Sequence, residues 1–450
     1  MINKSGDFFP GGVHYPPITK YNQISQEQMF KGYTLPSDGM LDIYAHIPFC
    51  KQRCVFCHYP VKLGERLSEK DNYLAAFDKE MDIYMKQLGV NKIRARSILV
   101  GGGTPTFLTL EQITRFLKNF TSKIDLSQCK QFNYDLDPGS MTGPEGKERL
   151  KIMRDFGVDR LTIGVQSLNE GVLKIMNRPH NEKEVYDAID IAKDLGYQIN
   201  IEFIFGHPGE TIENWIEVIE KAVRLDVPEI QLYRLKIEAY GDYQAPLKKL
   251  LTMRPETAIE SEDTIAMKQL AIDILNEHGY HENLRRVYSR KREHYSHYAR
   301  NQCCNLLDEI GLGLTAFSSL RDRYILNTAS FEEYYQKIES GQLPLNRGLV
   351  RSPEEQIRWA IILPLKNLDI WKPTFTERTG VALEDVFRPK IEKLKEYGLV
   401  KESEKKLELT RLGCFFADEV VETFSAPQYI PYPRSAYADG PLNPYVDNVP

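Results

Sequence analysis

The sequence has no excess of positive charge. Its 58 Lys and Arg residues are outnumbered by 63 Asp and Glu residues, so the formal net charge is −5 at pH 7 and the isoelectric point lies near 6.1. A basic field over the whole surface is what usually attracts a nucleic acid or an anionic membrane, and this chain does not carry one. We therefore expect no nucleic acid and no membrane among its partners.

Long apolar runs and an even set of cysteines are also absent. The first ten residues, MINKSGDFFP, lack the apolar run of a signal peptide, and no stretch approaches the roughly 20 apolar residues of a membrane helix. The seven cysteines form an odd number in a chain without an export signal, which argues against a disulfide framework. These absences predict reduced thiols and a cytoplasmic protein.

The composition is that of an ordinary globular protein. Hydrophobic residues make up 42% and charged residues 27% of the chain, with 25 Tyr, 20 Phe and a mean hydropathy of −0.42, which excludes wholesale disorder. The length of 450 residues is three times the ~150 residues expected of one domain. We expect one large domain and one smaller domain.

Short β-rich runs alternate with longer helical patterns over the first half of the chain, which is typical of βα units around a parallel sheet. The expected strands are 43–47, 97–100, 132–136, 160–165, 199–205 and 229–233. The expected helices are 69–87, 110–120, 145–156, 182–195 and 212–225, where apolar residues recur at helical spacing. This pattern predicts an α/β fold with a partial (β/α)6 TIM-like barrel, whose chemistry lies at the C-terminal ends of the strands.

The remaining segments predict further domains around this barrel. We expect an N-terminal extension over 1–41, the barrel over 42–250, a loop-rich barrel extension that covers the substrate over 251–350, a C-terminal helical, winged-helix-like domain over 351–424, and a tail over 425–450. The smaller domain includes a helical pattern and a short strand candidate at 405–409. The tail is rich in Pro and Tyr and lacks periodicity.

Three cysteines fall within eight residues, directly after the first expected strand. Cys50, Cys54 and Cys57 have the spacing C-x3-C-x2-C, and three thiols on one loop can bind three irons of a [4Fe-4S] cluster while the fourth iron stays open. The alternative is one face of a helix with cysteines as small buried hydrophobes. Two prolines flank the run and two basic residues lie within it, which favours the cluster.

A glycine run, Gly101 to Gly103, follows the second expected strand and leads into Thr104-Pro105-Thr106. Glycines at a strand end let the backbone approach a ligand closely. A tight turn is the alternative interpretation of such a run, but the cysteine motif upstream favours a ligand.

Together these motifs resemble those of the radical SAM superfamily. The cysteine spacing and the aromatic Phe56 just before the third cysteine match its cluster loop. The resemblance implies that the open iron holds S-adenosylmethionine (SAM), that the cluster cleaves it reductively to a 5′-deoxyadenosyl radical, and that the protein positions this chemistry. It also implies an electron donor such as flavodoxin or ferredoxin and a small-molecule substrate.

The later motifs resemble one branch, the oxygen-independent coproporphyrinogen III oxidase-like enzymes. They are Tyr-Asp-Leu-Asp-Pro ending at 138, Gly-Val-Gln ending at 166, Asn-Arg at 177–178, and Glu-Phe-Ile-Phe-Gly from 202. The family's Glu in the first of these motifs is Asp135 here, and its Asp in the last is Glu202. The resemblance assigns cofactor binding to Tyr44, Phe56, Gly102, Gly103, Thr104, Asp135, Gln166, Arg178, Glu202 and Tyr298, and the cluster to Cys50, Cys54 and Cys57.

Three departures bear on the reaction within this branch. Tyr59 stands where the decarboxylase usually has a fourth cysteine, and Tyr298-Ala299 stands where it has a Phe-Gln pair that contacts a second SAM. Of the haem chaperone's His-Asn-x-x-Tyr-Trp motif, only a His and a Tyr survive near 294–299. Our leading prediction is therefore methylation or cyclopropanation of a small organic substrate with two SAM molecules, by a class C-like radical SAM methyltransferase. The alternatives are an oxidoreductase that decarboxylates coproporphyrinogen III anaerobically and a haem-binding chaperone without turnover.

Overall fold

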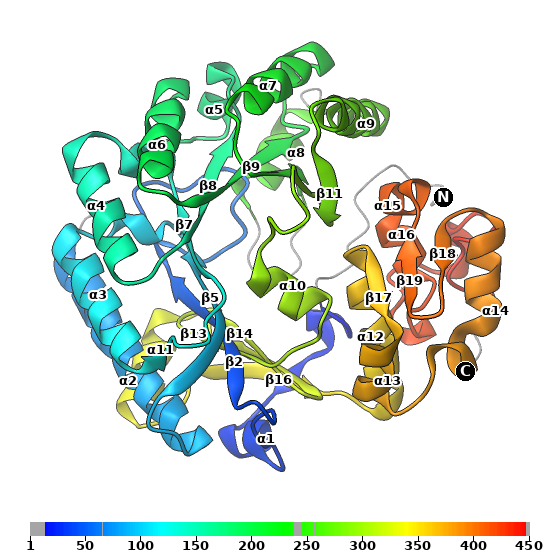
Figure 1. Cartoon of the computed structure of the whole chain (residues 1–450), viewed down its shortest axis with the longest axis horizontal. Coiled ribbons are helices and arrows are strands. Elements are labelled where there is room, and N and C mark those ends of the chain that lie inside the picture. Colours follow the sequence, from blue (N-terminus) through cyan, green and yellow to red (C-terminus); the bar gives the residue numbers. More distant parts are fainter. Residues whose placement is uncertain (1–13, 65, 238–244, 256–257, 447–450) are drawn as a thin grey trace.

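The structure, a computed structural model, describes residues 14–64, 66–237, 245–255 and 258–446. The first 13 residues of the predicted N-terminal extension and the last four of the predicted tail lie outside these ranges. The described residues form a curved sheet with an outer layer of helices, and a smaller domain beside it (Figure 1).

The curved sheet contains 14 strands among the described residues, in the spatial order β1-β16-β15-β14-β13-β2-β5-β7-β8-β9-β10-β12-β11, with β6 paired to β5. Its strands are β1 (Asn22–Gln23), β2 (Met40–Ile47), β5 (Ile93–Gly102), β6 (Ile124–Asp125), β7 (Phe132–Leu136), β8 (Arg160–Gln166), β9 (Gln198–Phe205), β10 (Glu229–Arg234), β11 (His281–Leu284), β12 (Val287–Ser289), β13 (Glu309–Leu312), β14 (Phe317–Leu320), β15 (Arg323–Asn327) and β16 (Leu345–Val350). Neighbouring strands from β2 to β10 run parallel.

These six central parallel strands confirm the predicted partial barrel. They are buried nearly along their whole length, as parallel strands covered on both faces are. The end strands of the sheet do not pair with each other in the described ranges, so the barrel stays open. A shorter sheet pairs β3 (Phe49–Cys50) with β4 (Lys62–Leu63).

The helices that accompany the curved sheet mostly lie outside the barrel, but α10 lies inside the ring that the others form (Figure 1). They are α1 (Gln26–Phe30), α2 (Leu67–Leu88), α3 (Leu110–Ser122), α4 (Gly143–Asp155), α5 (Glu170–Ile175), α6 (Glu182–Asp194), α7 (Ile212–Arg224), α8 (Pro246–Met253), α9 (Ser261–Glu277), α10 (His297–Cys303) and α11 (Phe331–Glu339). Helix α7 shows why these segments fold as they do: it buries Trp215, Val218, Ile219, Ala222 and Val223 at helical spacing, and the side chain of Thr211 caps its first turn. None of the helices in the described ranges combines the length and the apolar character needed to cross a bilayer.

The segment 251–350 holds more regular structure than the expected loop-rich extension. It contributes the hairpin β11–β12 to one end of the sheet and the strands β13 to β16 to the other. Strand β13 pairs in parallel with β2, so that Glu309 lies opposite Asp42. This pairing joins residues more than 250 positions apart, which local sequence patterns cannot reveal.

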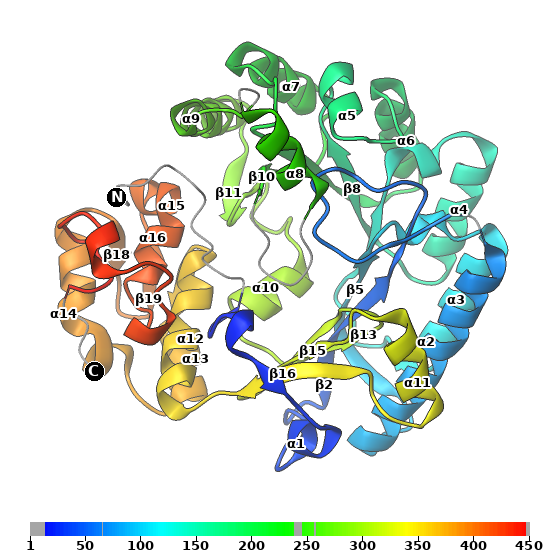
Figure 2. The ribbon, with the colours of Figure 1, turned by 180° about the vertical axis from the view of Figure 1, so that it is seen from behind.

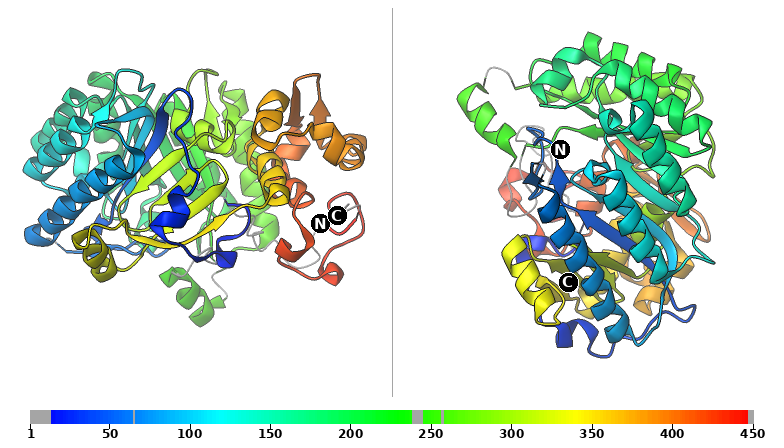
Figure 3. Two further views of the ribbon diagram at one scale, coloured as in Figure 1. Left: turned by 90° about the horizontal axis from the view of Figure 1, so that it is seen from below. Right: turned by 90° about the vertical axis from the view of Figure 1, so that its left-hand side faces the viewer.

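The smaller domain has its own apolar core and packs beside the barrel, as Figure 2 and Figure 3 also show. It contains α12 (Pro353–Lys366), β17 (Asp369–Trp371), α13 (Lys372–Thr379), α14 (Leu383–Glu396), β18 (Val400–Glu402), β19 (Lys406–Leu409), α15 (Arg411–Phe415) and α16 (Ala417–Glu422). The three strands form one antiparallel sheet beside the helices. This combination of helices and a small sheet confirms the helical, winged-helix-like character predicted for the domain. The described part of the tail packs on it, since the Tyr437 hydroxyl donates to Glu422.

One buried carboxyl joins α2 to the second half of the sheet. Glu80 is fully buried and accepts hydrogen bonds from the Tyr334 hydroxyl at 2.6 Å, the Gly313 amide at 2.8 Å and the Asn327 side chain at 3.1 Å. Burial raises the pKa of Glu80 to about 7, although the three hydrogen bonds oppose the shift.

We predict that this carboxyl makes the fold less stable as the pH rises from 5 to 8. Because its pKa is higher in the folded than in the unfolded chain, its contribution to stability is present at low pH and is lost as the pH rises through about 7. In urea denaturation, the free energy of unfolding of wild type should fall by about 3 kcal/mol more than that of Glu80→Gln over this range. Glu111→Gln, at an exposed position of α3, is the control, and identical pH profiles for wild type and Glu80→Gln would contradict the prediction.

Candidate functional site

The three clustered cysteines lie on the loop that follows β2, at the C-terminal edge of the barrel. Cys50 is buried at the end of β3, and Cys54 and Cys57 are half-buried; all three are free thiols. Burial raises the pKa of the Cys50 thiol to about 12 and also raises that of Cys57. In the described ranges, no three His, Cys, Asp or Glu side chains converge tightly enough to hold a single metal ion. A [4Fe-4S] cluster makes a different demand, because each thiolate binds a different iron.

The glycine run at the end of β5 packs directly beneath this loop. The amide of Gly103 donates to the carbonyl of Ile47 at 2.9 Å, and the amide of Thr104 donates to that of Phe49 at 2.8 Å. A Cβ atom at Gly103 would lie 2.8 Å from Cys50 Sγ, and Gly102 has a φ of 121° with Ile47 O 2.8 Å from the position of a Cβ. Only glycine fits these two positions without displacing the loop. The Thr104 hydroxyl donates to Cys50 Sγ at 3.6 Å.

The turn after α5 holds the cysteine loop from the other side. Asn177 donates from its side chain to Arg53 O at 2.7 Å and accepts from the Gln52 side chain at its own carbonyl at 2.8 Å. The Val55 amide donates to Met176 O at 3.1 Å. Asn177 adopts a positive φ of 56°, a conformation that Asn tolerates better than most residues. This turn places the next residue, Arg178, beside the thiols.

Arg178 connects the cysteine loop to the barrel. One terminal nitrogen donates to Cys54 Sγ at 3.3 Å, and the other donates to Asp137 at 2.5 Å and to Gly164 O at 2.7 Å. His180 faces the same carboxylate at 3.2 Å. Although burial works to raise the pKa of Asp137, the charge of Arg178 and the hydrogen bond from His180 hold it below its usual value. Asp137 therefore stays ionised and fixes the guanidinium.

Polar atoms near the thiols are buried without a hydrogen-bond partner in the described part of the chain. Outside the cysteine loop they include Arg178 Nε, a donor, and Gln166 Oε1, an acceptor; Arg53 Nε, on the loop itself, is a third. Gln166 also has a φ of 68°, and its side-chain nitrogen lies only 2.9 Å from where a Cβ on Gly164 would be. Buried polar atoms without a partner cost free energy, and a strained residue at a strand end is typical of a binding site. Three thiols, a glycine cradle and the two atoms outside the loop fit a [4Fe-4S] cluster with a polar ligand on its open iron.

Two acidic side chains lie inside the barrel near this loop. Asp135 is on β7 and Glu202 is on β9, and β8 runs between them, with Thr162 opposite Asp135 and Gly164 opposite Glu202. Asp135 accepts from Asn133 at 3.0 Å, and Glu202 accepts from the Tyr233 hydroxyl at 3.3 Å. Burial raises the pKa of Asp135 to about 6, and burial together with the charge of Asp135 raises that of Glu202 to about 8.

Several aromatic side chains lie close together around strand β2. The Tyr44 hydroxyl lies 2.9 Å from His46 Nδ1, and the rings of Tyr44 and Tyr298 are 6.3 Å apart. Tyr298, on α10, donates from its hydroxyl to the buried carboxyl of Glu309, whose pKa burial raises to about 8. The ring of Tyr59 lies 6.2 Å from that of His46. The structure thus brings Tyr298 next to Tyr44.

Phe56 points away from these polar groups. It packs against the apolar cluster of Leu235, Ala245 and Leu247 beneath α8, with its ring 6.1 Å from that of His207. The neighbouring His58 binds the same region: its Nδ1 accepts from the Ala245 amide at 3.2 Å, so its Nε2 donates to Lys236 O at 3.1 Å. Phe56 therefore anchors the loop within an apolar environment.

The structure adds side chains to the candidate site that the sequence analysis does not single out. Asp137 lies in the Tyr-Asp-Leu-Asp-Pro motif two residues after Asp135. His180, Tyr233 and Glu309 carry no local signal. Their positions follow from strand order rather than from spacing. Farther along, Cys303 and Cys304 are desolvated thiols whose pKa values burial raises, which fits inert cysteines.

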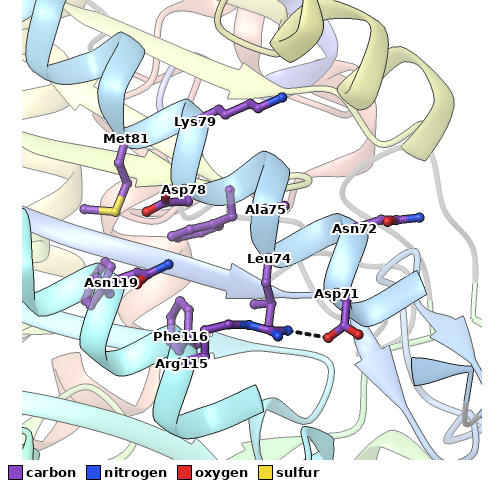
Figure 4. Close-up of a pocket in the computed structure, with 12 residues that line it drawn as sticks. Asp71, Asn72, Leu74, Ala75, Asp78, Lys79, Met81, Arg115, Phe116 and Asn119 are labelled. Atoms are coloured by element: carbon purple, nitrogen blue, oxygen red, sulfur yellow. Dashed lines mark hydrogen bonds and ion pairs between the residues drawn. The ribbon is translucent and has the colours of Figure 1, made fainter. Parts of the chain in front are cut away.

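A groove lies on the outer surface, away from this site. It has a volume of about 540 Å³ and is lined by α2 and α3, with Asp71 and Arg115 paired across it (Figure 4). Its lining residues come from the helical layer and not from the strand ends that carry the thiols.

Comparisons with known proteins identify two domains and several relatives. The profile of the radical SAM superfamily matches residues 44–222, and that of the HemN C-terminal domain matches residues 352–416. The heme chaperone HemW of Bacillus subtilis is 26% identical over 86% of this chain and 99% of its own length. An oxygen-independent coproporphyrinogen III oxidase of Helicobacter pylori is 26% identical over 93% of this chain and 94% of its own.

A solved structure supports the fold assignment. The coproporphyrinogen III oxidase HemN of Escherichia coli matches with a TM-score of 0.78 at 21% identity, over 92% of this chain and 97% of that one. The superfamily match begins at Tyr44 and includes the three cysteines, the glycine run, Gln166, Arg178 and Glu202. The chain therefore contains a radical SAM domain and a HemN C-terminal domain, and over most of its length it is similar to oxygen-independent coproporphyrinogen III oxidases and to a heme chaperone.

Proposed function

We propose that the chain is a radical SAM enzyme that oxidises a reduced tetrapyrrole, with anaerobic decarboxylation of coproporphyrinogen III as the first candidate reaction. The enzymatic part of this proposal is supported by the position of Arg178, which contacts Cys54 Sγ while its Nε has no hydrogen-bond partner among the described residues. The names of the relatives support the tetrapyrrole part, since they are coproporphyrinogen III oxidases and haem chaperones. These names give no support to the expected methylation or cyclopropanation and favour its two alternatives.

The residues around the thiols would hold the cofactors. Cys50, Cys54 and Cys57 would bind a [4Fe-4S] cluster, and the glycine run, Gln166 and Arg178 would hold SAM on it. When bound, the cluster supplies the electron that cleaves SAM and so starts hydrogen abstraction from the substrate. Asp137 keeps Arg178 in place, and the guanidinium suits the carboxylate of an amino-acid ligand.

The acids inside the barrel would serve the nucleoside end of SAM. Carboxyl groups are suited to the hydroxyls of a ribose, and Asp135 and Glu202 lie on either side of β8. Both residues depart from the family pattern. Asp135 is one methylene shorter than the family's Glu, and Glu202 is one methylene longer than the family's Asp. We interpret the two departures as a compensating exchange across one ligand.

The three clustered thiols generate the first prediction for this function. Cys54→Ala should lose iron after anaerobic reconstitution, together with the visible absorbance of the cluster and all formation of 5′-deoxyadenosine, because one iron would lack its protein ligand. Cys129→Ala is the matched control, since this half-buried thiol lies outside the loop. An iron content equal to that of wild type in Cys54→Ala would overturn the cluster assignment.

The exchange of acids generates a second prediction. Asp135→Glu and Glu202→Asp should each weaken SAM binding about tenfold. In the first variant the two acidic side chains together are one methylene too long to fit around one ligand, and in the second they are one methylene too short. The double variant should recover most of the affinity, as measured by equilibrium dialysis on reconstituted protein. Asp159→Glu, at the opposite end of the barrel, is the control: its carboxylate accepts from the Phe132 amide. Additive losses in the double variant would refute the compensation.

The substrate assignment is tested by anaerobic turnover. Reconstituted protein with reductant, SAM and coproporphyrinogen III should release carbon dioxide and 5′-deoxyadenosine. Tight stoichiometric haem binding without SAM cleavage would favour the chaperone instead. Formation of S-adenosylhomocysteine together with 5′-deoxyadenosine, on another substrate, would restore methyl transfer with two SAM molecules.

A further inference from the structure

His180 lies two residues after Arg178, in the short connection that leads from the turn at Asn177 into α6. Its side chain is fully buried. Asn181 fixes the far end of this connection, because it caps the first turn of α6. Its side chain accepts from the Glu184 amide at 3.0 Å, and its amide donates to the Glu184 side chain at 2.9 Å. The imidazole ring is therefore held between two fixed points of the chain.

Both ring nitrogens of His180 face hydrogen-bond acceptors. Nε2 lies 3.0 Å from Val165 O, and a main-chain carbonyl only accepts, so Nε2 carries a hydrogen. Nδ1 lies 3.2 Å from Asp137 Oδ2. Although burial works to raise the pKa of Asp137, the charge of Arg178 holds it below its usual value, so this carboxyl is an ionised acceptor as well. An imidazole that donates at both nitrogens is the protonated, cationic form.

On one side, His180 acts on Arg178 through Asp137. Oδ2 of this carboxylate accepts from both His180 and Arg178, and Oδ1 accepts from the Gly139 amide at 3.0 Å. A neutral imidazole could turn a lone pair of Nδ1 toward the carboxylate and repel it. Because Arg178 reaches from Asp137 to Cys54 Sγ, a rotation of the carboxylate would also move the guanidinium relative to the thiol.

On the other side, His180 acts on Gln166 through the carbonyl of Val165. This carbonyl also accepts from the Ser167 amide at 2.9 Å, which closes a three-residue turn with Gln166 at its centre. Turns of this kind with a positive central φ are rare and strained, and Gln166 has a φ of 68°. The hydrogen bond from Nε2 therefore helps to hold the strained turn, and with it the unpartnered Oε1 of Gln166.

The two side chains that His180 supports meet at Gly164. The carbonyl of Gly164 accepts from Arg178 at 2.7 Å. A Cβ atom on Gly164 would lie 2.9 Å from the side-chain nitrogen of Gln166 and 3.6 Å from a terminal nitrogen of Arg178. Gln166 and Arg178 are therefore neighbours, and a single imidazole ring supports both of them.

We propose that His180, as an imidazolium ion, is a positioning residue that holds Gln166 and Arg178 in the geometry that binds SAM. The inference rests on the proposed function and deepens it, because it makes SAM binding depend on one proton. Loss of this proton would leave the carboxylate facing a lone pair, so the affinity for SAM should fall as the pH rises. A histidine that merely fills space would not produce this dependence.

The charged groups that face His180 come from three elements. Asp137 follows β7, Arg178 lies on the turn of His180 itself, and Glu184 belongs to α6. Glu184 Oε1 and the Cβ of His180 both lie close to Gly139, and Oε2 of the same carboxylate accepts from the amide of the next residue along the chain from His180. Asp137 is thus the carboxylate that bonds to the ring of His180, whereas Glu184 is engaged at the helix start.

The test compares wild type with His180→Gln after anaerobic reconstitution of the cluster. Glutamine is neutral at every pH, so it removes the proton but keeps a side chain of similar size. Equilibrium dialysis measures the affinity for SAM, and the ratio of the two affinities at each pH cancels the titration of SAM itself. Wild type should bind about tenfold more tightly than His180→Gln at about pH 6, and the ratio should fall toward one by about pH 9.

The reduction potential of the cluster gives a second readout, which needs no bound SAM. Hydrogen bonds to the cysteine sulfurs help to set this potential, and a positively charged donor raises it. If His180 holds Arg178 against Cys54 Sγ, His180→Gln should have a lower potential than wild type at about pH 6 and a similar one at about pH 9. Arg178→Gln removes the donor itself and sets the largest shift to be expected.

His278→Gln is the matched control, because it makes the same substitution at an exposed histidine that ends α9. It should match wild type in both readouts at every pH. An iron content equal to that of wild type shows that a variant is folded around its thiols. If His180→Gln takes up less iron, Asp137→Asn replaces it, since an amide can donate to a neutral imidazole and so removes the need for the proton. The dependence of SAM affinity on pH should be lost in this variant too.

The outcomes separate this proposal from the proposed function. Failure of wild type to bind SAM rejects the proposed function, and the potential alone then decides whether His180 positions Arg178. If wild type binds SAM but the affinity ratio is the same at every pH, the inference is overturned. A potential that His180→Gln leaves unchanged at about pH 6 overturns it as well, whether or not SAM binds.

Discussion

The close packing of the cysteine loop on the glycine end of β5 is the constraint on which the rest of the site depends. The Gly103 and Thr104 amides bond to the carbonyls of Ile47 and Phe49, and a Cβ on Gly103 would lie 2.8 Å from Cys50 Sγ. Any larger residue there would push the first thiol away from the barrel. With the loop held at this depth, the turn at Asn177 can reach it from the opposite side and bring Arg178 to Cys54.

The interior of the barrel is polar, and this shapes what the site can do. At its base, Arg160 makes a bidentate ion pair with Glu229 at 3.1 and 2.7 Å and also donates to Asn133. Nearer the thiol loop, Asp135 and Glu202 have no such ion pair with any described residue, and burial raises the pKa of both. The polar groups at the base of the barrel thus have hydrogen-bond partners within the protein, whereas the two acids near its mouth are available to bind a ligand.

The two domains act on one region of the molecule. Asp418 and Lys366, from the smaller domain, meet Arg285 and Arg286 from the end of the barrel sheet. These ion pairs hold the two domains together.

Local patterns predicted much of this protein. A contiguous pattern in the sequence was enough to predict the cluster motif of Cys50, Cys54 and Cys57, the glycine run and the six βα units. The predicted strand 132–136, for example, matches β7. The motif order also indicated that Gln166 and Arg178 belong to one site. Neighbouring parallel strands end at the same edge of a sheet, so that residues at their ends must meet.

Other features were decided only by the tertiary structure. The pairing of Arg178 with Asp137, of Tyr298 with Glu309, and of Arg285 with Asp418 each joins segments that no local pattern connects. The same holds for β13, which pairs with β2 across most of the chain. The sequence by itself predicted the residues of the candidate site, because its motifs are local and resemble those of a known family. The tertiary structure alone decided their partners and their burial, because these depend on strand order and on how the domains pack.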